Sequence, residues 1–245
     1  MPLDHLTLLT ADIAAFASAV EHGPPDAAVA ACPGWTLHDL GVHLGTVHRL
    51  VIDALVTGGP PDGTTTHPPA PNDDPAGLAE WVREGAARMI VLMESTDPDE
   101  PTWHPFPVEP KVAGLWRRRQ AQEASVHRWD AQHAAGMDAH IERDMAADGI
   151  DEYFHVMLPR MLTREHRSTP ASTFAVELTD VDARWVADGA TGLPVMSAGG
   201  APAQGTLRGD AETILLRLWG RPVMAALDHA GDGGVIDEWL ALGGA

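Results

Sequence analysis

Residues 36–57 read TLHDLGVHLGTVHRLVIDALVT, a segment in which apolar residues recur every three or four positions. That spacing places them on one face of an α-helix. Thr36 and Asp39 have the residue types and spacing of a capping box, in which each side chain accepts a hydrogen bond from the other residue's backbone N–H. Gly58-Gly59-Pro60 ends the pattern. The segment therefore predicts one long helix with a buried face lined by Leu40, Leu44, Val47, Val51 and Ala54.

Three other segments share this period. The first runs from Leu6 to the Gly23-Pro24-Pro25 stop, another begins at Pro75 and closes over 95–98, and a further one extends from Val112 to Ala135. Amphipathic helices of this length are most simply assembled as a four-helix bundle. A fifth helical pattern, 150–162, is expected to close the bundle.

After residue 167 the pattern changes to that of short strands and short helices. Segments 173–178 and 183–187 are typical of strands joined by a turn, 205–208 of a further strand, and 211–219 and 236–242 of helices. Helices followed by a sheet-and-helix segment indicate two domains. We therefore predict a mainly α chain with a helical bundle over 1–165 and a smaller α+β domain over 166–245.

The composition excludes several classes of function. Sixteen Lys and Arg against 35 Asp and Glu leave a net charge of −19, which argues against binding to nucleic acid. The single cysteine, Cys32, cannot form an internal disulfide, which fits a reducing cytoplasm. Residues 1–10 lack a secretory pattern, and the longest uncharged stretch, 189–207, is broken by Gly and Pro. We expect a cytoplasmic protein with no nucleic-acid or membrane partner, a monomer or a homodimer.

Glu123 and His127 lie four residues apart, so their side chains leave the same helix face and can hold one metal ion. That face also carries Val126, and a buried carboxylate must be paired or bound to a metal. His43 lies on the apolar side of the 36–57 helix, whereas the competing His48 lies toward the edge of that stripe.

Two imidazoles and one carboxylate leave coordination positions open, as in catalytic zinc sites. Each residue also has a simpler interpretation. A Glu–His pair four apart is commonly a solvated surface pair, and an inward His is commonly a hydrogen-bonded core residue.

Several motifs resemble the mycothiol-dependent maleylpyruvate isomerase family, within the broader DinB-like metal-binding bundle superfamily. They are CPGWT at 32–36, DL at 39–40, HL at 43–44, EASVHRWD at 123–130, ADGIDE at 147–152, GTLRG at 205–209 and LWGR at 218–221. The resemblance covers most of the chain. It implies a DinB-like N-terminal bundle and a tail domain of the sterol-carrier type.

The resemblance implies that His43, Glu123 and His127 hold a divalent metal, usually zinc, and that mycothiol is the thiol co-substrate. In such an isomerase, the mycothiol thiolate would add to the cis double bond of maleylpyruvate, and rotation and expulsion would give fumarylpyruvate. Cys32 is expected to be a small buried apolar residue rather than that nucleophile.

Anionic substrates require a local cation in so acidic a chain. Arg119, one turn before Glu123, should reach the same site, although its run of arginines could equally solvate the helix. Arg221 resembles a tail-domain arginine that the family places near the site. Asp130 could orient a ligand histidine or pair with an arginine.

These observations leave two functions open. The first is a metal-dependent enzyme that activates a small thiol, either as an isomerase or as a thiol transferase. The alternative is a metal- or ligand-binding module without turnover. If the histidines only pack in the core, the three candidate ligands would lie apart in space.

Overall fold

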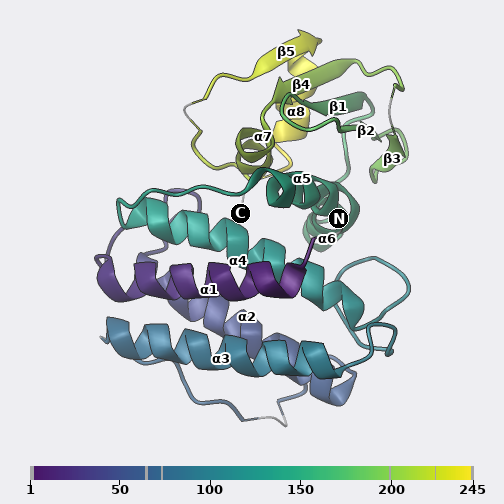
Figure 1. Cartoon of the computed structure of the whole chain (residues 1–245). Helices are drawn as coiled ribbons and strands as arrows, with labels where there is room; N and C mark the ends of the chain where they lie inside the picture. Colours follow the sequence, from purple (N-terminus) through teal and green to yellow (C-terminus); the bar gives the residue numbers. More distant parts are fainter. Residues whose placement is uncertain (1–2, 64–65, 73, 199, 224, 244–245) are drawn as a thin grey trace. The chain divides into compact units, whose positions relative to one another are not determined.

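A computed structural model of the chain describes residues 3–63, 66–72, 74–198, 200–223 and 225–243. The chain forms two compact units (Figure 1). The first unit runs to His104 and resumes over Glu109–His140. The second unit holds Pro105–Val108 and the chain from Ile141 onward.

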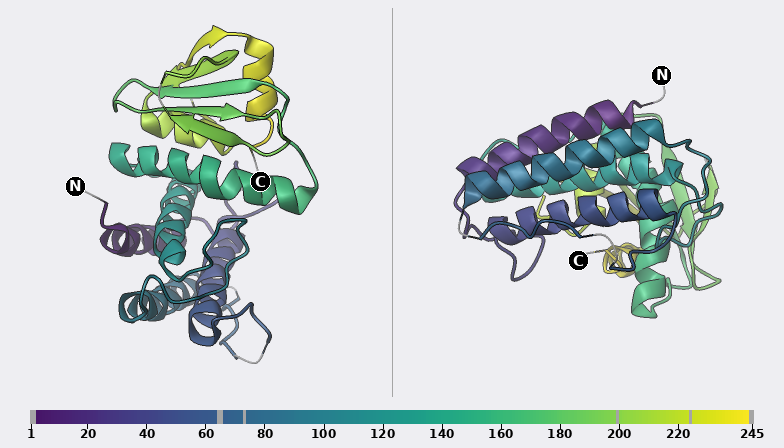
Figure 2. Two further views of the ribbon diagram at one scale, coloured as in Figure 1. Left: turned by 90° about the vertical axis from the view of Figure 1, so that its right-hand side faces the viewer. Right: turned by 90° about the horizontal axis from the view of Figure 1, so that it is seen from below.

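Four helices make up the first unit: α1 (His5–His22), α2 (Leu37–Thr57), α3 (Pro75–Ser95) and α4 (Gly114–Ala134). Each packs mainly on two neighbours, in the cyclic order α1, α4, α2, α3 (Figure 2, left). The predicted four-helix bundle is confirmed. Its fully buried side chains include Leu9, Phe16, Leu40, Leu44, Leu78, Met89 and Trp116.

The helix ends follow local sequence signals. Thr36 and Asp39 form both hydrogen bonds of the predicted capping box, and Gly58 ends α2 in the left-handed conformation at φ 69°. Pro75 occupies the first turn of α3, where its missing N–H costs nothing because that N–H would have no partner in the helix.

A long helix begins at Arg143 in the second unit, and its place differs from the expectation that the 150–162 helix closes the bundle. It consists of α5 (Arg143–Glu152), a π-helical turn η1 (Tyr153–Met157) and α6 (Leu158–Glu165). The helical pattern over 150–162 thus belongs to this unit and does not close the bundle. Pro159 explains the π turn, because it lacks an N–H and its ring crowds the carbonyl four residues earlier.

The rest of the second unit consists of β1 (Thr173–Leu178), β2 (Arg184–Asp188), β3 (Val195–Ala198), β4 (Gly205–Gly209), α7 (Ala211–Leu218), β5 (Asp228–Gly231) and α8 (Gly233–Leu240). The five strands form one sheet with spatial order β3-β2-β1-β4-β5 (Figure 2, left). Strands β1 and β4 are parallel, and the other pairs are antiparallel. The helix α8 packs on β1 and β4, and α5 packs on α7. The α+β tail domain is confirmed.

The packing divides the chain at 140/141, earlier than the boundary predicted at residue 165. Hydrogen bonds tie the α5 region to the rest of the second unit. The backbone N–H of Ile141 donates to the Glu212 carboxylate at 2.8 Å, and Trp185 Nε1 donates to Asp151 at 3.0 Å. The helix therefore belongs to the unit that holds the sheet, where α5 packs on α7.

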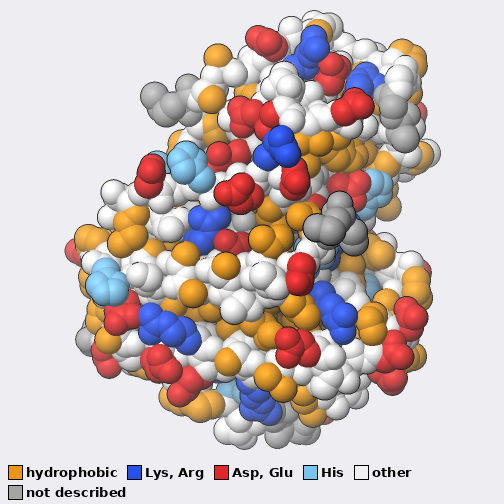
Figure 3. All heavy atoms as spheres, in the orientation of Figure 1, with side chains coloured by type: hydrophobic (Ala, Val, Ile, Leu, Met, Phe, Trp, Pro, Cys, Tyr) orange, Lys and Arg blue, Asp and Glu red, His pale blue; other side chains and the backbone are white. Residues whose placement is uncertain are grey.

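Among the described helices, α2 has the length and hydropathy of a membrane-crossing segment, but half of its most apolar window is buried. Core helices of bundles have the same composition, so this is weak evidence for a membrane span. Acidic and basic side chains are scattered over the face drawn in Figure 3.

Candidate metal centre

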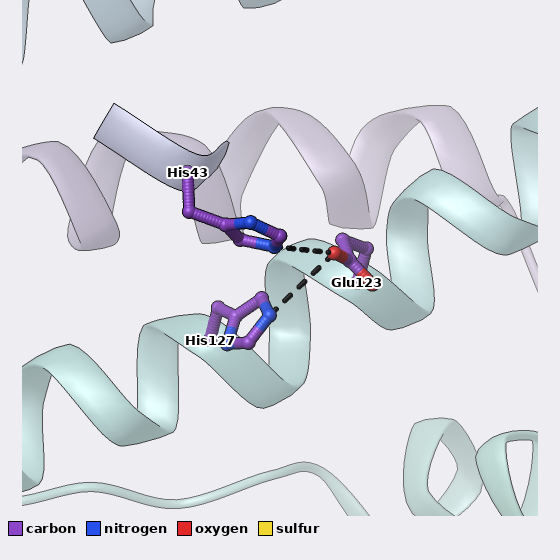
Figure 4. A group of neighbouring side chains, drawn as sticks. All are labelled: His43, Glu123 and His127. Atoms are coloured by element: carbon purple, nitrogen blue, oxygen red, sulfur yellow. Dashed lines mark hydrogen bonds and ion pairs between the residues drawn. The ribbon is translucent and has the colours of Figure 1, made fainter. Parts of the chain in front are cut away.

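His43 on α2 and Glu123 and His127 on α4 point toward one another across two neighbouring helices of the bundle (Figure 4). The distance from Glu123 Oε1 to His43 Nε2 is 3.2 Å, and to His127 Nε2 it is 3.5 Å. One ligand atom from each residue lies within 4.8 Å of the others. The structure thus brings together the three candidate ligands, which are up to 84 residues apart in the sequence.

These separations suit a zinc ion. Zinc bonds to nitrogen and oxygen are about 2.0–2.2 Å long, and a tetrahedron with such bonds has edges of about 3.3–3.6 Å. The observed 3.2 and 3.5 Å lie close to that edge length. Two imidazoles and a carboxylate are also the ligand types that zinc takes in three-residue sites. The residues present therefore fit the metal that the sequence predicts.

Two further side chains contact the candidate ligands. Asp130 Oδ2 lies 3.0 Å from His127 Nδ1, which leaves the Nε2 atom of that ring directed at Glu123. Arg119 donates to Glu123 Oε2 at 2.8 Å, so the other oxygen, Oε1, is the one that both histidines share. A carboxylate behind a ligand histidine fixes the ring and raises its basicity.

The neighbouring charges and hydrogen bonds shift the pKa values of Glu123 and His127 toward their charged forms. Burial alone would raise the pKa of Glu123, but hydrogen bonds with His127 and His43 and the charge of Arg119 hold it well below its usual value. Burial would lower the pKa of His127, yet Asp130 and Glu123 raise it to about 9. Without a metal, His127 and Glu123 thus form a charged pair in a largely buried site.

The three ligands differ in exposure. The His43 side chain is 32% exposed, whereas Glu123 is 17% and His127 12% exposed. The Trp35 ring lies against His43, with ring centroids 4.9 Å apart. In the sequence, Trp35 stands out only as part of the CPGWT motif, because no local pattern shows that it contacts a residue eight positions later.

His48 corrects a second expectation. It is fully buried rather than at the edge of the apolar stripe, and burial together with the charge of Arg49 lowers its pKa to about 3. Arg49, the next residue, is also buried, with its guanidinium carbon 3.6 Å from the centroid of the Trp81 ring. The choice of His43 is unaffected, because His48 is not part of the ligand cluster.

The other candidate substrate contact, Arg221, has a local hydrogen-bond acceptor. Arg221 belongs to the second unit, is 4% exposed, and donates to the Trp219 carbonyl at 2.9 Å. Its role at the centre stays a prediction. Arg117 bonds to the Met93 carbonyl near the end of α3, and Cys32 is buried, as expected for a small apolar residue.

Comparisons with known proteins bear on the fold and the family of this chain. No curated protein matches the chain. A crystal structure of the mycothiol-dependent maleylpyruvate isomerase is 14% identical, with a TM-score of 0.61 over 94% of this chain and 93% of that one. A histidine-to-alanine mutant of it is also 14% identical, with a TM-score of 0.62 over the same shares. Likeness at this identity shows a shared fold.

Two family profiles divide the chain between them. One, described as the mycothiol maleylpyruvate isomerase N-terminal domain, matches residues 6–132, and the other, the corresponding C-terminal domain, matches residues 144–238. The first match alone spans more than half of the sequence and includes all three candidate ligands. The chain belongs to the mycothiol maleylpyruvate isomerase family.

Proposed function

We propose that this chain is a zinc-dependent enzyme that activates mycothiol for addition to an unsaturated or electrophilic acid, with cis–trans isomerisation of maleylpyruvate as the leading reaction. The observation that carries the proposal is the spacing of the His43, Glu123 and His127 ligand atoms. Zinc held there would lower the pKa of a bound thiol, so that the thiolate forms near neutral pH.

Arg119 is the proposed contact for an anionic substrate. It lies beside Glu123, and its guanidinium carries five N–H donors in a fork that matches a carboxylate. It also supplies positive charge locally in a chain of net charge −19. Arg221 is proposed as a second carboxylate contact, supported by its match to the family motif.

The proposed partners are small molecules: a low-molecular-weight thiol and an anionic acceptor. The acidic composition disfavours nucleic acid, and the lone buried cysteine suits a reducing cytoplasm. We propose a cytoplasmic monomer or homodimer.

Metal content is the first test. Protein purified without a metal-affinity step is analysed by mass spectrometry alongside His127→Ala and a control, His133→Ala, which removes an exposed histidine from the same helix. About one zinc per chain is expected in the wild type and the control, and its loss in His127→Ala, because a three-ligand site does not survive loss of one ligand.

Turnover is the second test. Maleylpyruvate isomerisation is followed with and without mycothiol, in the wild type, Arg119→Ala and Arg221→Ala. We expect isomerisation by the wild type to depend on mycothiol. We also expect each arginine variant to have a raised KM or a lowered kcat. Stoichiometric zinc without isomerisation or thiol consumption would favour the metal-binding module. Absence of metal even after zinc is added back would contradict the proposed function.

A further inference from the structure

The two histidines of the metal centre are held in different ways. His127 has a carboxylate, Asp130, behind its Nδ1 atom. In the part of the chain that the structure describes, the only polar partner of the His43 ring is Glu123, on the Nε2 side. A single hydrogen bond fixes one corner of an imidazole and leaves the ring free to rotate about it. Because His43 is also the most exposed ligand, water competes for this ring.

The indole ring of Trp35 makes a second contact with the His43 imidazole. The Trp35 ring lies against His43 with centroids 4.9 Å apart and an interplanar angle of 53°. The other ring of the centre, His127, meets His43 edge to face with centroids 5.2 Å apart. His43 thus contacts both an indole and the second candidate histidine.

The backbone around Trp35 is fixed on both sides. Residues 32–35 form a β-turn closed by the Trp35 N–H bonding to the Cys32 carbonyl at 2.9 Å. Pro33 and Gly34, with Gly34 at φ 85°, are the residue types of a type II turn. The Trp35 carbonyl accepts from Val29 N–H at 3.0 Å, and Thr36 then starts the capping box of α2. The backbone of Trp35 is therefore held in a defined position directly before the helix that carries His43.

We propose that Trp35 is a positioning residue for His43: its indole holds the imidazole so that Nε2 is directed at the metal position, the part that Asp130 plays for His127. The inference rests on the proposed function only in taking the centre as a metal site. An aromatic contact can do this because tilted rings pack over a defined area and exclude water from one side of the imidazole.

The test compares Trp35→Ala, Trp35→Phe and a control, Trp185→Ala, which removes a half-buried indole from the second unit. Zinc affinity is measured by competition with a chromophoric chelator, and coordination by the visible spectrum of the cobalt-substituted protein. Loss of a residue that orients a ligand typically weakens metal binding about 10–100-fold. We expect a loss in this range and an altered cobalt spectrum for Trp35→Ala. Trp35→Phe should restore most of the affinity, and the control should match the wild type.

A metal-free readout separates this inference from the proposed function. Nuclear Overhauser contacts between the ring protons of His43 and His127 report the ring position directly. They should be present in the wild type and in Trp35→Phe and be lost in Trp35→Ala, while thermal unfolding verifies that each variant is folded.

The outcomes are distinguishable. Wild-type protein that binds no zinc contradicts the proposed function, and the ring contacts then decide the role of Trp35 alone. Wild-type protein that binds zinc, together with a Trp35→Ala variant of unchanged affinity and cobalt spectrum, overturns the inference and leaves the proposed function standing.

Discussion

The two oxygens of the Glu123 carboxylate face different partners. Arg119 holds Oε2, and the imidazoles of His43 and His127 meet at Oε1. A carboxylate bound in this way stays ionised despite burial, because each neighbour favours its charged form. This explains how a charged side chain is retained inside an apolar bundle.

Metal binding should compete with protons at His127. Its pKa is raised to about 9, and an imidazole must be neutral to bind a metal. Zinc affinity is therefore expected to rise about tenfold per pH unit between pH 7 and about 9 and to level off above. Chelator competition across this range measures the slope, and a flat profile would contradict a protonated His127.

The same pKa has a consequence for the metal-free protein. Protonated His127 stabilises the folded state through its contacts with Asp130 and Glu123. Because the pKa in the folded state lies above the unfolded value of 6.5, this contribution to the free energy of unfolding is fully present below pH 6.5 and is lost as pH rises through about 9.

Asp130 should contribute to metal affinity without contacting the metal. Asp130→Asn removes the charge behind His127 Nδ1 and keeps the side-chain size, so zinc binding should weaken by about 10–100-fold. The pH at which affinity levels off should also fall, because Asp130 helps to raise the pKa of His127. Asp138→Asn, which alters an almost fully exposed carboxylate, is the control in both measurements.

At the scale of the element, the turn before α2 links backbone geometry to the centre. Gly34 has φ 85°, and a Cβ there would meet no atom within 4 Å, so the cost of a side chain comes from the backbone alone. Gly34→Ala should lower the free energy of unfolding by about 1–2 kcal/mol. It should also weaken zinc binding if the turn positions Trp35.

Thermal unfolding and chelator competition measure both effects. Gly233→Ala is the control, because that glycine also has open space but no positive φ. If Gly34→Ala and Gly233→Ala lower the free energy of unfolding equally, backbone strain at the turn is excluded as the cause of the loss.

At the scale of the molecule, all three ligands lie in the first unit. Zinc that binds only the folded bundle stabilises it by about 4 kcal/mol at a thousand times the dissociation constant. Chelation should therefore increase amide hydrogen exchange in α2 and α4 and leave the β1–β4 core of the second unit unchanged. Hydrogen-exchange mass spectrometry of the full chain with and without a chelator measures this, and equal changes in both units would contradict it.

Most of the sheet and the helices other than the first part of α5 could be predicted, because their signals are local. Apolar periodicity and the Thr36–Asp39 box located α2 to within a residue. The strands β3 and β5 were not predicted, because they are short edge strands, and β5 is exposed throughout, so neither shows an alternating pattern.

The sequence by itself determined the helical bundle, the α+β tail, and a Glu–His pair on one helix face, since each depends on residues a few positions apart. The family motifs also include His43, but only the tertiary structure brings it together with that pair across 80 residues. The tertiary structure alone also decided that His48 and Arg49 are buried, that Trp35 contacts His43, and that the helix over 143–165 belongs to the unit that holds the sheet. These features depend on which helices become neighbours, and helical periodicity defines a buried face without specifying what packs against it.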